Sequence, residues 1–155
     1  MLDTLMFFYL VVPLVHLIHE AGHVSLAKLH KVNNTQIEIG IGPKLIQFSF
    51  RGTSVRINII PFLGGHSTND TQGELPHRKV AWISLGGPLF NLVSVLLVIP
   101  FWTPYQFSFS TLFILFSLWI GIVNLIPFKL GEKRSDGWQI VAAIIKLVKK
   151  DRLGV

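Results

Sequence analysis

The chain of 155 residues has no cysteine, and this absence excludes several classes of protein at once. Without thiols there is no disulfide scaffold, thiolate zinc finger, iron–sulfur cluster or cysteine nucleophile. Charge is also scarce, since 14% of the residues are charged and 50% are hydrophobic, with a mean hydropathy of +0.55. Soluble domains usually carry about 25% charged residues. The composition therefore favours a mainly α membrane protein, and the length favours a single domain over residues 1–155.

One long stretch has no charged residue at all. Between Lys79 and Lys129 lie 49 consecutive uncharged residues. A membrane span needs about 20 apolar residues, so this stretch predicts two spans, at about 80–100 and 107–128. The turn between them contains two prolines and several aromatic residues of the kind found at membrane interfaces.

A third apolar run extends from Thr4 to Ala27 and contains one formal charge, Glu20. It predicts a first span at about 4–28. The run is longer than a signal peptide and no basic region precedes it, so we do not expect it to be cleaved. The chain is thus expected to have three transmembrane helices.

The basic residues fall into two groups. Seven of the 14 Lys and Arg residues lie between the first and second predicted spans, and seven follow the third. Three spans put both groups on one face, which the positive-inside rule makes cytoplasmic, with the N-terminus outside. Topology and anionic lipid explain the net charge of +6, so no nucleic-acid partner is expected. The small cysteine-free core favours a multi-pass protein of a prokaryotic cell membrane.

The polar segment between the first two spans predicts a small membrane-associated β-hairpin or sheet at about 35–66. Apolar residues alternate there with polar residues or glycine, at Ile37, Ile39 and Ile41 and again at Val55, Ile57 and Ile59. Such alternation is typical of short strands, and we expect two or three in antiparallel order. One hypothesis is that these strands bind an unwound substrate segment by edge-strand addition.

The C-terminal part predicts an amphipathic helix at about 137–150. On a helical wheel, Trp138, Val141, Ile144, Ile145 and Val148 share one side, and Lys146, Lys149 and Lys150 share the other. This helix either lies at the cytoplasmic membrane interface or packs against the helix bundle.

His19-Glu20-Ala21-Gly22-His23 is an H-E-x-x-H sequence inside the first predicted span. Positions i and i+4 share one helix face, so both imidazoles can bind one zinc ion. Glu20 can then accept a proton from a water that the zinc activates. Ionisable residues within a span are costly and indicate function by default.

Catalytic zinc usually has three protein ligands and one open position, so a third ligand is expected. Asp136 is the first candidate because it follows the third span on the cytoplasmic side; its alternative role is to cap the C-terminal helix. His16 shares the helix face of His19 and His23, but three ligands on one straight helix do not easily surround a tetrahedral ion. His66 follows a Gly-Gly turn and is either a further candidate or a solvated loop residue.

Two asparagines lie within the second and third predicted spans. Asn91 follows paired glycines that permit close helix approach, and Asn124 begins the motif Asn124-Leu125-Ile126-Pro127. Each either makes an interhelical hydrogen bond or contacts the peptide carbonyl and its oxyanion.

Together these motifs resemble the site-2 protease family of intramembrane zinc metalloproteases. The resemblance rests on four segments: His19 to His23, Pro61-Phe62-Leu63-Gly64-Gly65-His66, Gly86-Gly87-Pro88 with Asn91, and Asn124 to Pro127 with Asp136-Gly137. It implies one Zn²⁺ per chain on His19, His23 and Asp136, and Glu20 as general base and acid. It also implies that Asn91 and Asn124 contact the substrate or the oxyanion.

The sequence departs from that family in one place. The family's aspartate usually follows the asparagine–proline motif closely, in a short Leu-Asp-Gly, whereas here residues 128–134 intervene and Ser135 replaces the leucine. From its length we also expect none of the PDZ or CBS domains that many relatives carry.

The predicted function is hydrolysis of a peptide bond near the cytoplasmic face of the membrane. The expected substrate is a membrane-embedded peptide or single-span protein, with the lipid bilayer as surroundings and any regulatory membrane protein unidentified. Two other functions remain open. One is a membrane zinc-binding or transport protein without hydrolytic activity, and the other is an inactive homologue that serves as a scaffold.

Overall fold

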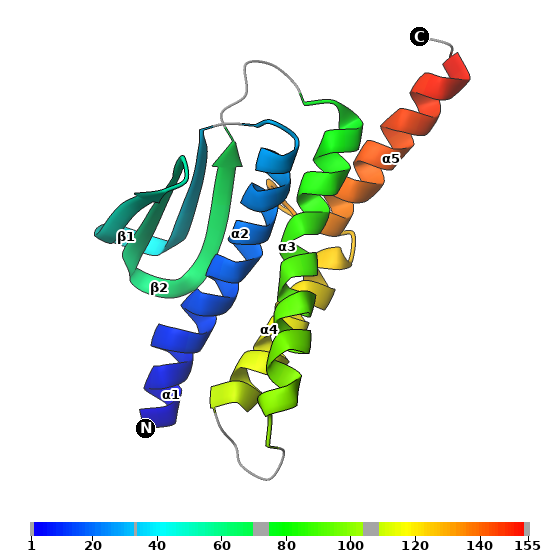
Figure 1. Ribbon diagram of the computed structural model, residues 1–155. Coiled ribbons are helices and arrows are strands. Elements are labelled where there is room, and N and C mark those ends of the chain that lie inside the picture. The colour runs from blue at the N-terminus through cyan, green and yellow to red at the C-terminus, as the bar shows by residue number, and fades with distance from the viewer. Residues whose placement is uncertain (1, 33, 70–74, 104–108, 154–155) are drawn as a thin grey trace.

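The computed structural model describes residues 2–32, 34–69, 75–103 and 109–153, and it is mainly helical with one β insertion (Figure 1). The elements are α1 (Leu2–Met6), η1 (Phe7–Val11), α2 (Val12–Leu29), β1 (Thr35–Phe50), β2 (Thr53–Asn69), α3 (His77–Val98), η2 (Ile99–Phe101), α4 (Phe109–Leu125), β3 (Lys129–Leu130), β4 (Lys133–Arg134) and α5 (Asp136–Leu153). α1, η1 and α2 follow one another without a break, the η1 turn being π-helical.

Two helical segments are long and apolar enough to cross a membrane, Thr4–Leu29 and His77–Phe101. They correspond to the first two predicted spans. α4 is a shorter apolar helix of 17 residues. Residues 104–108, with the end of the predicted turn and the start of the third predicted span, lie outside the described residues. α4 ends at Leu125, earlier than predicted, because Pro127 restricts the residue before it and cannot continue the helix.

α2 lies between the sheet and α3, and α3 in turn lies between α2 and α5 (Figure 1). Two glycines bring α2 and α3 together. A Cβ atom added to Gly22 would lie 2.2 Å from the Gly86 carbonyl oxygen, and one added to Gly86 would lie 2.4 Å from the Gly22 oxygen. Only hydrogen fits at both positions, so the two backbones touch beside the H-E-x-x-H turn.

The β insertion is one bent sheet that extends over residues 35–69. Segment 53–58 pairs with 44–50 in the predicted antiparallel direction, and 35–39 pairs antiparallel with 65–69. A third ladder, between 35–39 and 53–57, runs parallel and was not predicted. It forms because each strand is long enough to bend and pair twice. The backbone bends where Gly40 and Gly64 adopt positive φ angles of 76° and 82°, which other residues rarely reach.

Apolar contacts hold α2 on both sides. Towards the sheet, Val24 packs in a cluster with Ile37, Ile39 and Val55. Towards the bundle, a second cluster is formed by Val11, Val15, Val95, Phe113 and Ile114. Because both faces of α2 are covered, the polar side chains between these clusters are enclosed within the protein.

α5 begins at Asp136, one residue earlier than predicted, and packs against α3. Its first two residues, Asp136 and Gly137, are buried, whereas the apolar stripe predicted from the helical wheel is partly exposed. The exposed side chains are Trp138, Val141, Ile144, Ile145 and Val148. The helix therefore packs on the bundle with one face and keeps its apolar stripe available to the surroundings.

Candidate metal centre

One turn of α2 carries three buried ionisable residues. His19, Glu20 and His23 are only 5%, 6% and 8% exposed, and all three line the same cavity. The two histidines are four residues apart, so the helix turns both imidazoles to one side. Their Nε2 atoms lie 3.2 Å apart.

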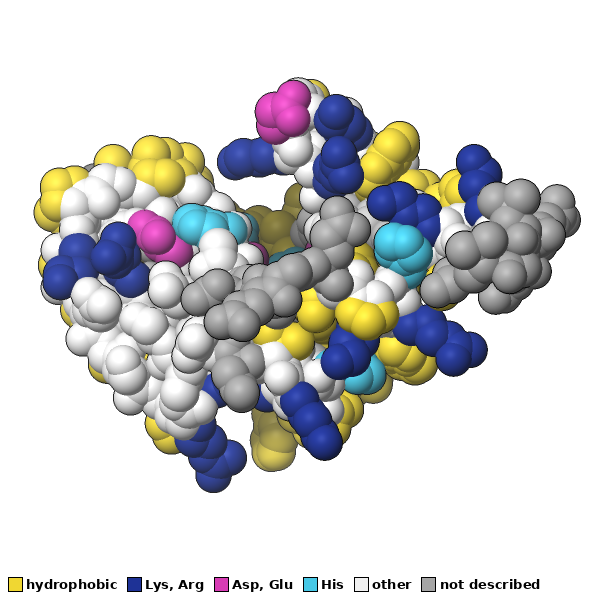
Figure 2. Space-filling view, turned by 90° about the horizontal axis from the view of Figure 1, so that it is seen from above, with side chains coloured by type: hydrophobic (Ala, Val, Ile, Leu, Met, Phe, Trp, Pro, Cys, Tyr) yellow, Lys and Arg dark blue, Asp and Glu magenta, His cyan; other side chains and the backbone are white. Residues whose placement is uncertain are grey.

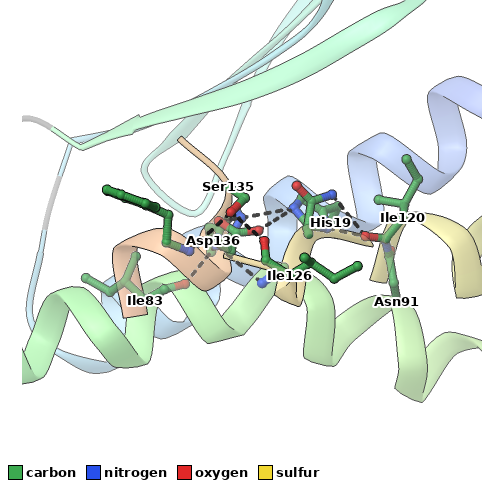
Figure 3. Close-up of polar contacts among 11 residues, drawn as sticks. His19, Ile83, Asn91, Ile120, Ile126, Ser135 and Asp136 are labelled. Carbon is green, nitrogen blue, oxygen red and sulfur yellow. Dashed lines mark hydrogen bonds and ion pairs between the residues drawn. The ribbon is translucent and has the colours of Figure 1, made fainter. Parts of the chain in front are cut away.

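Asp136, at the start of α5, completes the cluster. Its Oδ2 atom lies 3.1 Å from His19 Nε2, and its Oδ1 atom lies 3.4 Å from His23 Nε2 (Figure 3). Zinc bonds to nitrogen of 2.0–2.1 Å in a tetrahedral arrangement imply ligand separations of about 3.3 Å. The two imidazoles and the carboxylate therefore have the spacing of three corners of a zinc tetrahedron, although Asp136 follows His19 by 117 residues.

Ser135 fixes the place of Asp136. Its hydroxyl donates to the carbonyl of Ile126 at 2.7 Å and accepts from the amide nitrogens of Phe128 and Trp138 at 3.0 and 3.1 Å. The hydrogen bond from the Trp138 amide makes Ser135 the N-cap residue of α5. The other two hydrogen bonds connect Ser135 to the segment that directly follows α4. Asp136 is thus the first residue of a helix whose origin is anchored on the third apolar helix.

The outer ring nitrogens of both histidines are engaged by α3. His23 Nδ1–H donates to the carbonyl oxygen of Ile83 at 2.7 Å. Asn91 is fully buried, with Nδ2 3.3 Å from His19 Nδ1 and Oδ1 without a partner among the described residues. Turning the amide by 180° places Oδ1 against Nδ1–H and satisfies it. Both Nε2 atoms then carry lone pairs that face the aspartate.

Three acceptors that converge in this way require a cation between them. Two imidazole lone pairs and a carboxylate repel one another at 3.1–3.4 Å unless positive charge separates them. A proton on either imidazole serves the same purpose. In that protonated state, although burial alone would raise the pKa of Asp136, hydrogen bonds from His19 and His23 lower it. The carboxyl group is therefore ionised and available as a ligand.

α3 leaves room beside the cluster because residue 87 is glycine. A Cβ atom there would lie 2.5 Å from His23 Nε2 and 2.6 Å from His19 Nε2, at the metal-facing atoms themselves. No side chain larger than hydrogen is compatible with both imidazoles. The donor set, its spacing and this gap all fit a zinc ion.

The cluster opens into a cavity of about 790 Å³. β2 forms one wall, where the glycine at position 65 lets the strand pass directly over Glu20. Beside that strand, Glu38 of β1 accepts a hydrogen bond from Asn58 at 2.8 Å and lies 3.7 Å from His66 and 3.8 Å from Arg56. The sequence analysis assigned no partner to Glu38. A signal was present, because Glu38 and Asn58 each occupy a polar position between two apolar residues of an alternating strand.

The other predicted residues lie as follows. Asn124 lines the cavity, and its Nδ2 donates to the Ile120 carbonyl of its own helix at 2.9 Å. Asn91 is 0% exposed and contacts His19 from behind. His16 bonds to the carbonyl of Val12 at 2.8 Å and meets the ring of Phe116 in α4 edge to face, and His66 faces Glu38. The structure thus brings neither His16 nor His66 to the two histidine Nε2 atoms.

Sequence reasoning assigned no role at the cluster to Ser135 or to the carbonyl of Ile83, and it interpreted Gly87 only as one of a glycine pair that permits close helix approach. The first carried a signal, since serine directly before an aspartate and an apolar helix is a capping pattern. The carbonyl carried none, because any residue at position 83 would present one.

Comparison with known proteins places these observations among relatives. The model of peptidase family M50 matches residues 7–107. A protein of Thermotoga maritima named "Putative zinc metalloprotease" is 31% identical over 106 residues, 59% of this chain and 21% of its own length. One of the same name from Borreliella burgdorferi is 30% identical over 117 residues, 63% of this chain and 27% of its own. An uncharacterized membrane protein of Bacillus subtilis is 29% identical over 149 residues, 90% of this chain and 87% of its own.

The chain therefore spans about a quarter of the length of the curated zinc metalloproteases that it matches, and most of the length of the membrane protein from Bacillus subtilis. The family match includes the H-E-x-x-H turn, the β insertion and α3. It ends before α4, so the position of Asp136 rests on the contacts described above.

The cluster predicts that zinc binding needs residues from both ends of the chain. Replacing either His23 or Asp136 by alanine removes one of three ligands, and each variant should lose most of its zinc in mild detergent. Zinc per protein, measured by atomic emission, checks this against wild type and against Asn58→Ala, which changes the opposite wall. Full zinc occupancy in Asp136→Ala would show that another residue is the third ligand.

The contact between Asn91 and His19 predicts a second effect. Asn91→Ala leaves the ligands intact but frees the imidazole of His19, so zinc affinity should fall about 10- to 100-fold. Competition with a fluorescent chelator measures this affinity. Ser94→Ala is the matched control, since Ser94 bonds to the backbone of Asn91 at 2.7 Å and contacts no histidine. Equal affinities in the two variants would contradict a role for the Asn91 side chain.

Proposed function

This chain belongs to peptidase family M50, and we propose that it is an intramembrane zinc metalloprotease that hydrolyses a peptide bond near the cytoplasmic face. One observation carries the proposal. The imidazoles of His19 and His23 and the carboxylate of Asp136 converge to 3.1–3.4 Å at the end of a cavity that Glu20 also lines. A purely structural contact among these three side chains would not need the second carboxylate, that of Glu20, which is also buried and lines the same cavity.

We propose one zinc ion per chain, held by His19, His23 and Asp136. When bound, zinc supplies a Lewis acid that polarises a peptide carbonyl and lowers the pKa of a bound water to about 7. The chain's own contribution is orientation. The Ile83 carbonyl and Asn91 hold the two imidazoles, and Ser135 holds the aspartate.

Glu20 has the place of a general base and acid. It is next to a ligand in sequence, is 6% exposed and lines the cavity, so it can reach a water in that space and the nitrogen of a bound peptide bond. In this role it accepts the proton of the attacking water and later gives it to the leaving amine. Asn124, which also lines the cavity, is placed to bind the peptide carbonyl or its oxyanion.

The substrate we propose is a membrane-embedded peptide or a single-span protein. A transmembrane helix hides its peptide bonds, so a substrate has to unwind locally before it is cut. Residues 63–67 of β2 line the cavity and offer an extended backbone beside which an unwound segment can lie. The bilayer is the surrounding medium, and no nucleic acid is involved.

The charge distribution supports a cytoplasmic position of the cavity. With three spans, all 14 basic residues lie on one side, so the positive-inside rule puts the N-terminus outside and α5 in the cytoplasm. α4, with 17 described residues, is the shortest of the three proposed spans and would need residues beyond its described start.

The proteolytic role predicts that Glu20→Gln keeps zinc but loses cleavage. Removing a general base costs about 100-fold or more in rate, whereas the three ligands are unchanged. Purified protein in lipid vesicles, offered a panel of fluorogenic single-span peptides, measures the rate, and zinc content of the same preparations is the control. Zinc transport into the vesicles, unaffected by Glu20→Gln, would instead indicate a transporter.

The absence of cysteine makes the topology directly testable. Single cysteines in place of Thr103, after η2, and of Lys149, in α5, each report alone because the chain has no other thiol. A membrane-impermeant maleimide should label Thr103→Cys in intact cells and Lys149→Cys only after permeabilisation. The reverse pattern, or labelling of both from one side, would contradict the three-span topology.

A further inference from the structure

A small hairpin interrupts the path from α4 to Asp136. β3 and β4 pair in antiparallel register, Lys129 with Arg134 and Leu130 with Lys133. The tight turn is made possible by Gly131, whose φ is 59°. The hairpin coincides with the inserted residues that distinguish this sequence from the family it resembles.

The hairpin is anchored at its base rather than loosely attached. The amide nitrogen of Ser135 donates to the Phe128 carbonyl at 3.1 Å, and the Phe128 amide nitrogen donates to the Ser135 hydroxyl at 3.0 Å. These two bonds close the loop immediately before Asp136. A side chain on β4 therefore has a fixed relation to the metal cluster.

Two cations of this hairpin face the cavity. Lys133 and Arg134 both line it and are exposed, whereas Lys129 and Glu132 do not line it. Among the described residues neither Lys133 nor Arg134 makes an ion pair. Figure 2 shows the molecule from above, with a hollow beside the sheet, a His and an acidic side chain on its sheet side, and Lys and Arg side chains across from them.

The opposite wall differs in charge. Glu38 of β1 also lines the cavity, but Asn58, Arg56 and His66 already surround its carboxylate. The sheet wall thus presents a satisfied carboxylate, and the hairpin wall presents two cations without a described partner. Two apolar side chains of the same wall, Phe128 and Leu130, also line the cavity. This combination suits an apolar segment that carries a negative charge.

We propose that the β3–β4 hairpin selects substrates, with Lys133 and Arg134 binding a carboxylate of the segment that occupies the cavity. The proposal rests on the proteolytic function proposed above and names its substrate class, an apolar stretch flanked by a carboxylate. An arginine fork binds a carboxylate through two parallel hydrogen bonds, and a lysine adds a point charge. The carboxylate comes from an acidic side chain or from a C-terminus.

Binding, not cleavage, tests this selection. Zinc-loaded Glu20→Gln protein in phosphatidylcholine nanodiscs retains bound peptide uncut, so affinity can be measured by fluorescence anisotropy. The probes are a labelled apolar peptide with a flanking glutamate and its twin with glutamine, each with a free or an amidated C-terminus. Comparing the twins isolates the side chain, and comparing the ends isolates the terminal carboxylate.

The expected result is about fivefold tighter binding of one carboxylate-bearing peptide over its neutral twin, a preference that weakens at high salt. Lys133→Gln with Arg134→Gln should abolish the preference. Lys146→Gln with Lys149→Gln is the matched control: it removes the same charge from exposed positions of α5 outside the cavity and should leave the preference intact.

Two outcomes would overturn the proposal. One is equal affinity of the charged and neutral peptides for the unaltered hairpin. The other is a preference that survives loss of both hairpin cations, or that disappears equally in the α5 control. If the preference is absent and Lys133→Gln with Arg134→Gln instead weakens binding of the protein to vesicles that contain phosphatidylglycerol, the cations bind lipid and the proposal is wrong. Because no arm requires hydrolysis, failure here leaves the rate and zinc tests of Glu20 unaffected.

Discussion

The architecture depends on one constraint, that two imidazoles of α2 and a carboxylate from the start of α5 meet at 3.1–3.4 Å inside an apolar bundle. Helices with ordinary side chains at their contact lie 8–10 Å apart, too far for α3 to reach behind the imidazoles of α2. Gly22 and Gly86 remove that distance, and Gly87 removes the side chain that would occupy the cluster itself. Small residues, rather than the ligands alone, therefore create the site.

Much of this centre could be predicted from the sequence, because its key spacing is local. His19 and His23 meet through helix geometry, which four residues determine. Asp136 required a long-range contact, and only the order of motifs indicated it. The supports behind the ligands were not predictable in the same way. Asn91 had two readings, and the carbonyl that holds His23 has no sequence signature.

The sheet shows the opposite case, in which the pattern was clear and the pairing was not. Alternation of apolar and polar residues predicts a strand and the face that it buries, but it does not predict which other strands this strand pairs with. Here the same residues 35–39 pair on both sides, parallel on one and antiparallel on the other. The bends at Gly40 and Gly64 make this arrangement possible, and they also carry Glu38 and residues 63–67 to the cavity. The unusual topology thus brings a polar wall to the metal cluster.

The β3–β4 hairpin lies within the seven residues 128–134 and still returns the chain to the metal cluster. The two strands of an antiparallel hairpin begin and end side by side. Two hydrogen bonds between Phe128 and Ser135 hold the two ends of this hairpin together. The hairpin therefore adds side chains of its own beside Asp136. Two of these side chains, Lys133 and Arg134, are cations that line the cavity, so their charge acts on any molecule that enters it.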